Sequence, residues 1–135
     1  MRTSPNKMLA TIFGAVYLLV GLVGFFVTSG VGFFATEGRN LIVFEVNPLH
    51  NVIHLLIGAA LLAAGLRSVP AAKATNSTVG SVYLLVGIVG LFLPGTSLNI
   101  IALNGADNVL HLGSALVLLA VGMSQDRTAA ARVVA

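Results

Sequence analysis

Three histidines are the residues of this sequence whose type and spacing best suit chemistry. His50 and His54 are four residues apart, and His111 follows Asp107 at the same interval. Residues four apart share one face of a helix, so two such donors can bind one metal ion together. The spacing is suggestive only, because it lacks the additional residues that make a motif such as HExxH specific.

An asparagine precedes two of these histidines at the same distance. Asn51 lies three residues before His54, and Asn108 lies three residues before His111. Both pairs occur in apolar stretches of the chain, where polar side chains that face lipid are costly. We therefore expect both pairs to point into a helix bundle.

The polar cluster of His50, Asn51, His54, Asp107, Asn108 and His111 has three interpretations. In the first, asparagine and histidine form interhelical hydrogen bonds; each group has a donor and an acceptor, so this clasp needs no metal and no cofactor. In the second, His54 and His111 bind haem, a metal ion or a quinone in a redox module. In the third, the cluster lines a proton or solute path in a small transporter. We expect the clasp.

The neighbouring residues have a structural explanation as helix caps. Asn47 stands before Pro48, and an asparagine followed by proline at the first helical position is a strong helix start. Asn104 begins a second element of the same kind, and Asp107 falls at its third helical position, where its carboxylate can accept from free backbone N–H groups. We expect Asn47, Pro48 and Asn104 to act at helix starts.

The elements that carry these residues are apolar enough for a membrane. Charged residues make up 8% of the 135 residues and apolar residues 57%, whereas an ordinary soluble domain is about 25% charged. A membrane helix needs about 20 mostly apolar residues. Four segments qualify or nearly do: about Met8–Thr28, Pro48–Leu66, Val79–Leu93 and Gly105–Met123. The sequence therefore predicts an all-α integral membrane protein embedded in the lipid bilayer.

The four segments form two similar units. Residues 14–26 (GAVYLLVGLVGFF) and 80–92 (GSVYLLVGIVGLF) are identical at ten of thirteen positions, and residues 47–55 (NPLHNVIHL) resemble 104–112 (NGADNVLHL). We expect a single membrane domain, 1–135, with repeat one at about 8–66 and repeat two at about 77–123. Two tandem parallel-repeat hairpins would be related by an axis along the membrane normal. Recurrence of the first segment also argues against a cleaved signal peptide.

The charged residues predict an orientation. Six of the seven cations lie in the tails and the central connection, and the other side carries Arg39 alone. The six are Arg2, Lys7, Arg67, Lys73, Arg127 and Arg132. Because cytoplasmic loops carry the excess of Lys and Arg, we expect a multi-pass protein of a bacterial inner (plasma) membrane with both termini cytoplasmic.

Several function classes are excluded or disfavoured. The absence of cysteine removes disulfides, iron–sulfur clusters and thiolate zinc sites. The basic residues are not clustered with aromatic residues, so nucleic acid is not an expected partner. No nucleophile–base arrangement or phosphate-binding loop is recognised. We expect a non-enzymatic protein, a structural or accessory subunit whose partners are other membrane subunits or a second copy.

Two further expectations concern packing. Gly14, Gly21 and Gly24 share a helix face with Tyr17 and should allow close helix contact, whereas the side chain of Tyr17, like that of Tyr83, should lean away from the histidines. The segment from about Ser29 to Val46 mixes apolar residues with single charges and should lie along the membrane interface.

Residues 44–58 (FEVNPLHNVIHLLIG) and 103–119 (LNGADNVLHLGSALVLL) resemble domain-of-unknown-function family 4383. The resemblance extends over roughly residues 8–123. It implies a four-helix bacterial inner-membrane protein with no established activity, and it carries over no catalytic role. The family pattern falls on the capping residues and on the polar cluster already described.

Overall fold

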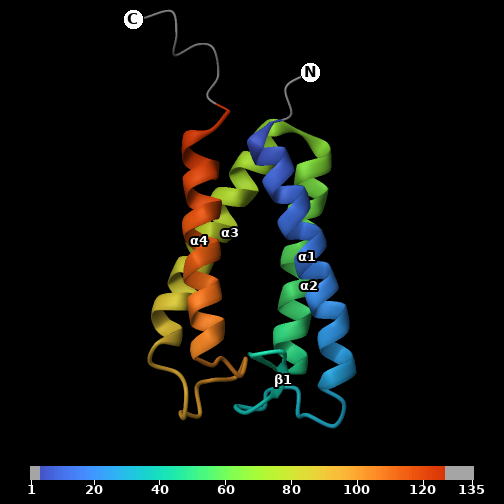
Figure 1. Ribbon diagram of the computed structural model, residues 1–135, viewed down its shortest axis with the longest axis vertical. Helices are drawn as coiled ribbons and strands as arrows, with labels where there is room; N and C mark the ends of the chain where they lie inside the picture. Colours follow the sequence, from blue (N-terminus) through green and yellow to red (C-terminus); the bar gives the residue numbers. More distant parts are fainter. Residues whose placement is uncertain (1–3, 127–135) are drawn as a thin grey trace, which may run out of the picture.

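The computed structural model describes residues 4–126, which are mostly helical. The helices are α1 (Pro5–Val27), α2 (Pro48–Arg67), α3 (Val69–Gly90) and α4 (Gly105–Ser124). Consecutive helices run in opposite directions, so α1 and α2 form one hairpin and α3 and α4 form another (Figure 1). We call the end that contains connections 28–47 and 91–104 the loop end, and the opposite end, where α1 begins and α4 ends, the terminal end.

A capping side chain fixes the start of each helix. The side-chain oxygen of the capping residue accepts from the backbone N–H three residues further on, which satisfies a donor that the helix leaves free. The four capping residues are Ser4, Asn47, Ser68 and Asn104. Proline in the first turn of α1, α2 and α3 loses no helix hydrogen bond there. Ser68 alone connects α2 to α3, so these helices are joined by a tight turn.

Three helices, α1, α2 and α4, are long and apolar enough to cross a membrane. Their bounds lie within three residues of those predicted from the sequence. The end of α3 at Gly90 also lies within three residues of the predicted Leu93, but its start at Val69 precedes the predicted Val79 by ten residues, a longer extension than the apolar pattern indicates. Its first turns contain Lys73 and Asn76, so hydropathy did not detect a helix start that its alanines and its cap favour.

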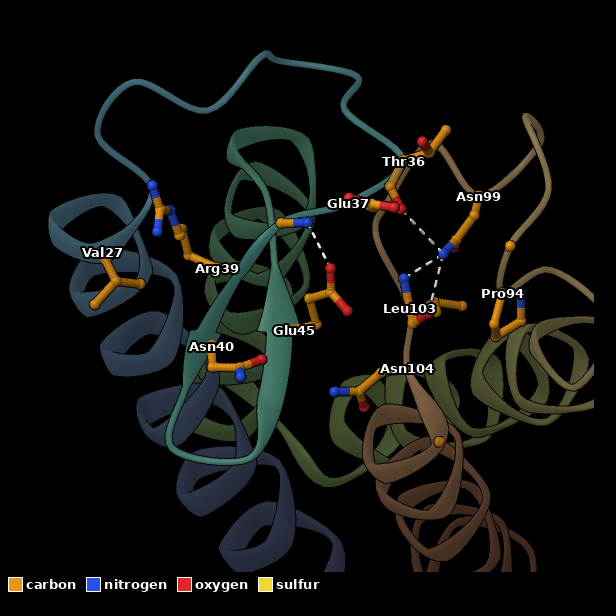
Figure 2. A pocket seen from close by; sticks show the side chains of 13 residues that line it. Val27, Thr36, Glu37, Arg39, Asn40, Glu45, Pro94, Asn99, Leu103 and Asn104 are labelled. Atoms are coloured by element: carbon orange, nitrogen blue, oxygen red, sulfur yellow. Dashed lines mark hydrogen bonds between the residues drawn. The ribbon is translucent and has the colours of Figure 1, made fainter.

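A β-hairpin at the loop end departs from the expected all-α fold. Strand β1 (Arg39–Leu41) pairs antiparallel with β2 (Phe44–Val46). Before β1, the Gly38 backbone N–H donates to Glu45 Oε1 at 2.6 Å (Figure 2). The turn at Ile42 and Val43 has none of the glycine or asparagine residues that usually identify a hairpin, and Ile42 adopts a φ of 65°. The sequence therefore offered no hairpin signal.

Within each hairpin, glycines bring the helix backbones into contact. Gly14 of α1 lies against the backbone of Gly58 and Leu62 in α2, and Gly80 of α3 lies against Leu119 in α4. The expected glycine packing face of α1 is therefore present. Between the hairpins, a buried core contains Ala10, Tyr17, Leu61, Ala72, Val79, Tyr83, Ala115 and Leu118.

Candidate functional site

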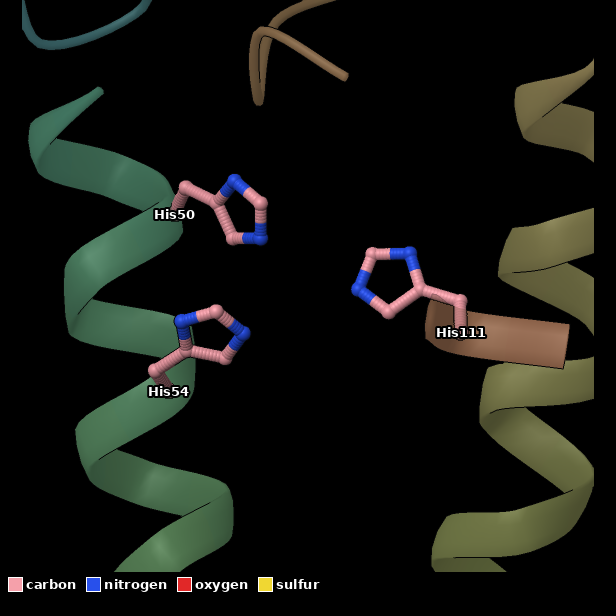
Figure 3. Close-up of side chains that lie close together, drawn as sticks. All are labelled: His50, His54 and His111. Carbon is pink, nitrogen blue, oxygen red and sulfur yellow. The ribbon is translucent and has the colours of Figure 1, made fainter. Parts of the chain in front are cut away.

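The three histidines meet between the hairpins, toward the loop end. His50 and His54 lie on consecutive turns of α2, and His111 lies on α4. Their exposed fractions are 2%, 6% and 4%, respectively. One ring nitrogen from each lies within 4.8 Å of the others. Figure 3 shows that Nε2, the nitrogen farther from Cβ, faces the space between the three rings in each case.

Helix capping places these side chains. The Asn47 side-chain oxygen accepts from the His50 backbone N–H at 2.8 Å, which puts His50 in the first turn of α2. In α4 the equivalent position is occupied by Asp107, and Asn104 accepts from its backbone N–H at 3.0 Å. Asp107 does not join the histidines, because its Oδ2 accepts from the backbone N–H groups of Asn104 at 2.9 Å and of Glu45 at 3.0 Å.

The expected asparagine–histidine clasp is wrong. Asn51 Nδ2 donates to Thr28 Oγ1 at 3.0 Å, and Asn108 Nδ2 donates to the Gly90 carbonyl at 2.8 Å. Each asparagine thus bonds to the end of the first helix of its own hairpin. The cause is a glycine on that helix: Gly24 leaves room for the Asn51 side chain and Gly90 leaves room for that of Asn108.

The histidines are therefore left with unsatisfied polar atoms. Nδ1 of all three rings is buried without a hydrogen-bond partner among the described residues, as are the hydroxyls of Tyr17 and Tyr83. Each such group costs about 1–3 kcal/mol. Buried unsatisfied polar groups are uncommon in native proteins and require an explanation, such as an ordered water molecule. An ion held between the three Nε2 atoms would not bind these Nδ1 atoms, so the case for an ion depends on the convergence of the Nε2 atoms alone.

Two tyrosines enclose the histidines, contrary to the expectation that they lean away. The Tyr17 ring stacks on His54, with centroids 5.7 Å apart and an interplanar angle of 19°. The Tyr83 ring meets His111 edge-on at 5.0 Å, and the two tyrosine rings are 5.5 Å apart. The two tyrosines thus pack directly against His54 and His111, one from each hairpin.

The donor set favours a transition-metal ion. Three imidazole nitrogens suit zinc, copper, nickel or iron. A cavity of about 190 Å³ lies beside His54, lined by α1 and α4, but neither His50 nor His111 lines it, so it is not the space between the three nitrogens. The geometry can bind an ion and leave one coordination position open.

A second polar cluster, at the terminal end, was missed in the sequence. Asn76 Nδ2 donates to the Asn6 carbonyl and to Asn6 Oδ1, both at 3.0 Å, which joins α3 to α1. Asn6 Nδ2 donates in turn to Asp126 Oδ2 at 3.0 Å. Both asparagines have exposed fractions of 0%. This cluster links the two hairpins at the terminal end. Asn6 and Asn76 lie outside the apolar segments predicted from the sequence, so the hydropathy pattern does not indicate that they are buried.

Comparison with protein families gives one match, over most of the chain. A family model with the description Domain of unknown function (DUF4383) matches residues 7–124. Comparisons with curated proteins and with solved structures find no match. The matched region contains all four helices except the first two residues of α1, and therefore includes the three histidines.

Proposed function

The chain belongs to the DUF4383 family, and because that description gives no activity, we propose its function from the geometry of the histidines. The protein is a non-enzymatic membrane protein that binds one transition-metal ion between His50, His54 and His111. The observation that carries this proposal is the convergence of three buried imidazole nitrogens within 4.8 Å of one another.

Coordination needs only small side-chain movements. Zinc binds imidazole nitrogen at about 2.0–2.1 Å, so neighbouring donors of a tetrahedral site lie about 3.4 Å apart. Rotation of the histidine side chains can close the remaining distance without moving a helix. In metal sites the second ring nitrogen usually donates to a carbonyl, a carboxylate or water. Among the described residues Nδ1 of each ring is without a hydrogen bond, and for His50 the backbone carbonyls of Glu45 and Ile101 are the nearest acceptors.

The membrane architecture that we propose has four crossings in two tandem repeats. Helix α3 has 22 residues and a length of about 33 Å, enough for a hydrocarbon core of about 30 Å. Equivalent contacts support the repeat: Asn51 packs on Gly24 as Asn108 packs on Gly90. The protein resides in a bacterial inner membrane with both termini cytoplasmic. Of the cations behind this orientation, Arg2, Arg127 and Arg132 lie outside the described residues.

The biological role that fits these features is an accessory one. The helices present apolar side chains outward, among them Leu19, Leu56 and Leu116, so the bilayer surrounds the bundle. A metal-binding subunit of this size would assemble with other membrane-protein subunits or with a second copy of itself. We propose no nucleic-acid partner.

Metal titration of the purified protein tests the proposal. Detergent-solubilised protein is stripped with a chelator, exchanged into Co²⁺ or Zn²⁺, and analysed for bound metal and for the visible spectrum of Co²⁺. We expect about one ion per chain and a tetrahedral Co²⁺ spectrum. His54→Ala and His111→Ala should each lower the affinity by about a hundredfold, because they remove a direct ligand, whereas loss of an outer-shell partner costs 10–100-fold.

Asn76→Ala is the matched control. Asn76 is a buried polar residue of α3 at the terminal end, and it lies outside the proposed site. This variant should bind the metal as the unaltered protein does. Retention of the ion by both histidine variants would show that the metal binds elsewhere and would overturn the proposal.

A further inference from the structure

We propose that the histidine centre opens only toward the loop end, by displacement of the segment 28–46, which we call the strap. If the proposed function holds, this opening is the route by which the metal ion enters and leaves its site. Accessibility of the imidazoles is nevertheless a property of the chain alone and can be measured without metal.

The terminal end is closed by packing. The buried core that follows the histidines in this direction includes Leu61 of α2, Leu118 of α4 and the two tyrosines. Beyond it, Asn76 donates twice to Asn6 and links the two hairpins. Figure 1 shows the hairpins close together at this end and diverging toward the loop end. A route here would have to separate the apolar core and then break the asparagine pair.

The sides of each hairpin are also closed. A Cβ added at Gly14 would lie 2.5 Å from the Leu62 backbone nitrogen, and one added at Gly58 would lie 2.7 Å from that of Leu18. The same closeness recurs in the second hairpin, where a Cβ on Gly80 would lie 3.0 Å from the Leu119 backbone nitrogen. Backbones packed at this distance leave no passage for an ion within a hairpin. Between the hairpins, the cavity beside His54 is lined by α1 and α4, and apart from His54, Tyr17 and Ser114 its lining side chains are apolar, so it offers a cation no ligands on the way in.

The strap covers the loop end. It is held there mainly by hydrogen bonds in which side chains of neighbouring segments donate to its backbone carbonyls. Asn47 Nδ2 donates to the carbonyls of Ala35 and Ile100, both at 2.7 Å. Asn104 Nδ2 donates to the Val43 carbonyl at 2.9 Å. Further contacts run from Asn99 Nδ2 to the Thr36 carbonyl at 3.3 Å, from the Glu45 N–H to Asp107 at 3.0 Å and from the Leu49 N–H to the Phe33 carbonyl at 3.3 Å. The bond from Asn51 Nδ2 to Thr28 Oγ1 holds the first residue of the strap.

A cavity of about 960 Å³ lies next to these contacts. The strap lines one side of it and residues 94–105 line the other (Figure 2). Its lining includes the carboxylates of Glu37 and Glu45 and a single cation, Arg39. The balance of these charges favours entry of a cation over entry of an anion.

The two ends therefore differ in what opening requires. At the loop end, the polar groups of the strap can exchange protein hydrogen bonds for water, so the net cost of each break is small. At the terminal end, separation would expose apolar core side chains, which is costly because it reverses hydrophobic burial. The centre should therefore exchange its ion with one side of the membrane, as a metal acceptor does and a transporter does not.

Chemical modification of the histidines tests this without metal. Diethyl pyrocarbonate modifies accessible imidazoles, and peptide mass spectrometry can follow His50, His54 and His111 separately. Asn104→Ser loosens the strap, because serine still caps α4 but is too short to reach the Val43 carbonyl. Asn76→Ala, the matched variant at the terminal end, removes the contact with Asn6. We expect modification to accelerate about three- to tenfold in Asn104→Ser and to stay at the original rate in Asn76→Ala.

A second strap variant and a transport assay make the test decisive. Asn99→Ala releases the Thr36 carbonyl and should also accelerate modification. Phosphatidylcholine liposomes that contain the protein and an internal zinc-sensitive dye should show no more Zn²⁺ influx than empty liposomes. Faster modification in Asn76→Ala than in either strap variant, an unchanged rate in both strap variants, or protein-dependent influx would each overturn the proposal. Failure to bind metal at equilibrium would instead contradict the proposed function and leave the accessibility result intact.

Discussion

The side chains of Asn51 and Asn108 show how one glycine decides the partner of a polar residue. Each asparagine lies three residues before a histidine, yet each turns toward the first helix of its own hairpin. Gly24 and Gly90 provide the space, since a side chain at either position would occupy the place of the asparagine oxygen. The imidazoles are thereby left without an amide partner and are free to bind a ligand.

Gly24→Ala and Gly90→Ala should each destabilise the protein by about 1–3 kcal/mol, because the added methyl group overpacks the asparagine. Thermal unfolding in detergent, followed by circular dichroism, measures the effect. Gly113→Ala is the control, because a Cβ there meets no atom within 4 Å. It should be neutral or stabilising by up to about 1 kcal/mol, as expected for alanine in a helix. Equal destabilisation by all three substitutions would show that the asparagine contact is not the cause.

At the residue level the sequence predicted positions better than partners. The repeated pattern that places an asparagine three residues before a histidine correctly singled out buried residues, because polar groups in apolar helices must face the bundle. It failed on the hydrogen bonds, since the deciding glycines lie on a different helix. The pattern placed all three histidines in one polar cluster, but it predicted ligands only in pairs, His50 with His54 or His54 with His111, and not the set of three that the structure brings together.

Among the helices, α3 departs most from its predicted bounds, because it begins ten residues earlier than predicted. These additional residues help to close the terminal end. The additional turns from Val69 to Thr78 carry Asn76 to the partner that it needs on α1. A hydropathy window cannot detect such turns, because they are polar on one face and rich in alanine. The remaining helix bounds followed from caps and apolar length, which are local signals. The β-hairpin cannot be predicted from its own residues. Its turn is stabilised by a residue distant in the sequence, the α4 cap Asn104, whose side chain donates to the Val43 carbonyl.

Asp126 fastens the end of α4 to the start of α1. Its Oδ2 accepts from Ser4 Oγ at 2.6 Å and from the Asn6 backbone N–H at 3.1 Å. Desolvation raises the pKa of this carboxyl, but the hydrogen bonds from Ser4 and Asn6, together with the charge of Lys73, outweigh it and hold the pKa below its usual value. The ionised form is thus the one that the fold stabilises.

Asp126→Asn should therefore lower stability at neutral pH and have little effect in acid. A carboxyl with a lowered pKa contributes fully above its unfolded pKa of about 3.9 and loses that contribution as the pH falls through the folded pKa. The loss should be less than about 1 kcal/mol, because the group is partly exposed. Melting curves from pH 7 to pH 3 measure it. A gap between the two proteins that widens in acid would contradict this assignment.

At the scale of the whole molecule, the two ends carry different charges. Lys7, Arg67 and Lys73 lie at the terminal end, whereas Glu37 and Glu45 lie at the loop end. Cations concentrate on cytoplasmic segments of membrane proteins, so the described residues favour a cytoplasmic terminal end. In the orientation that we propose, the strap and its cavity would face the outside, and the metal of the proposed site would come from there.

Single cysteines in this cysteine-free chain test both the orientation and the fourth crossing. Ile42→Cys and Thr96→Cys place a thiol on each connection of the loop end, and Pro70→Cys places one at the terminal end; all three positions are exposed. In intact cells, a membrane-impermeant maleimide should label positions 42 and 96, and position 70 should react only after the membrane is permeabilised. The reverse pattern would invert the orientation. Labelling of 42 but not of 96 would show that α3 does not cross, because α3 alone separates position 70 from position 96.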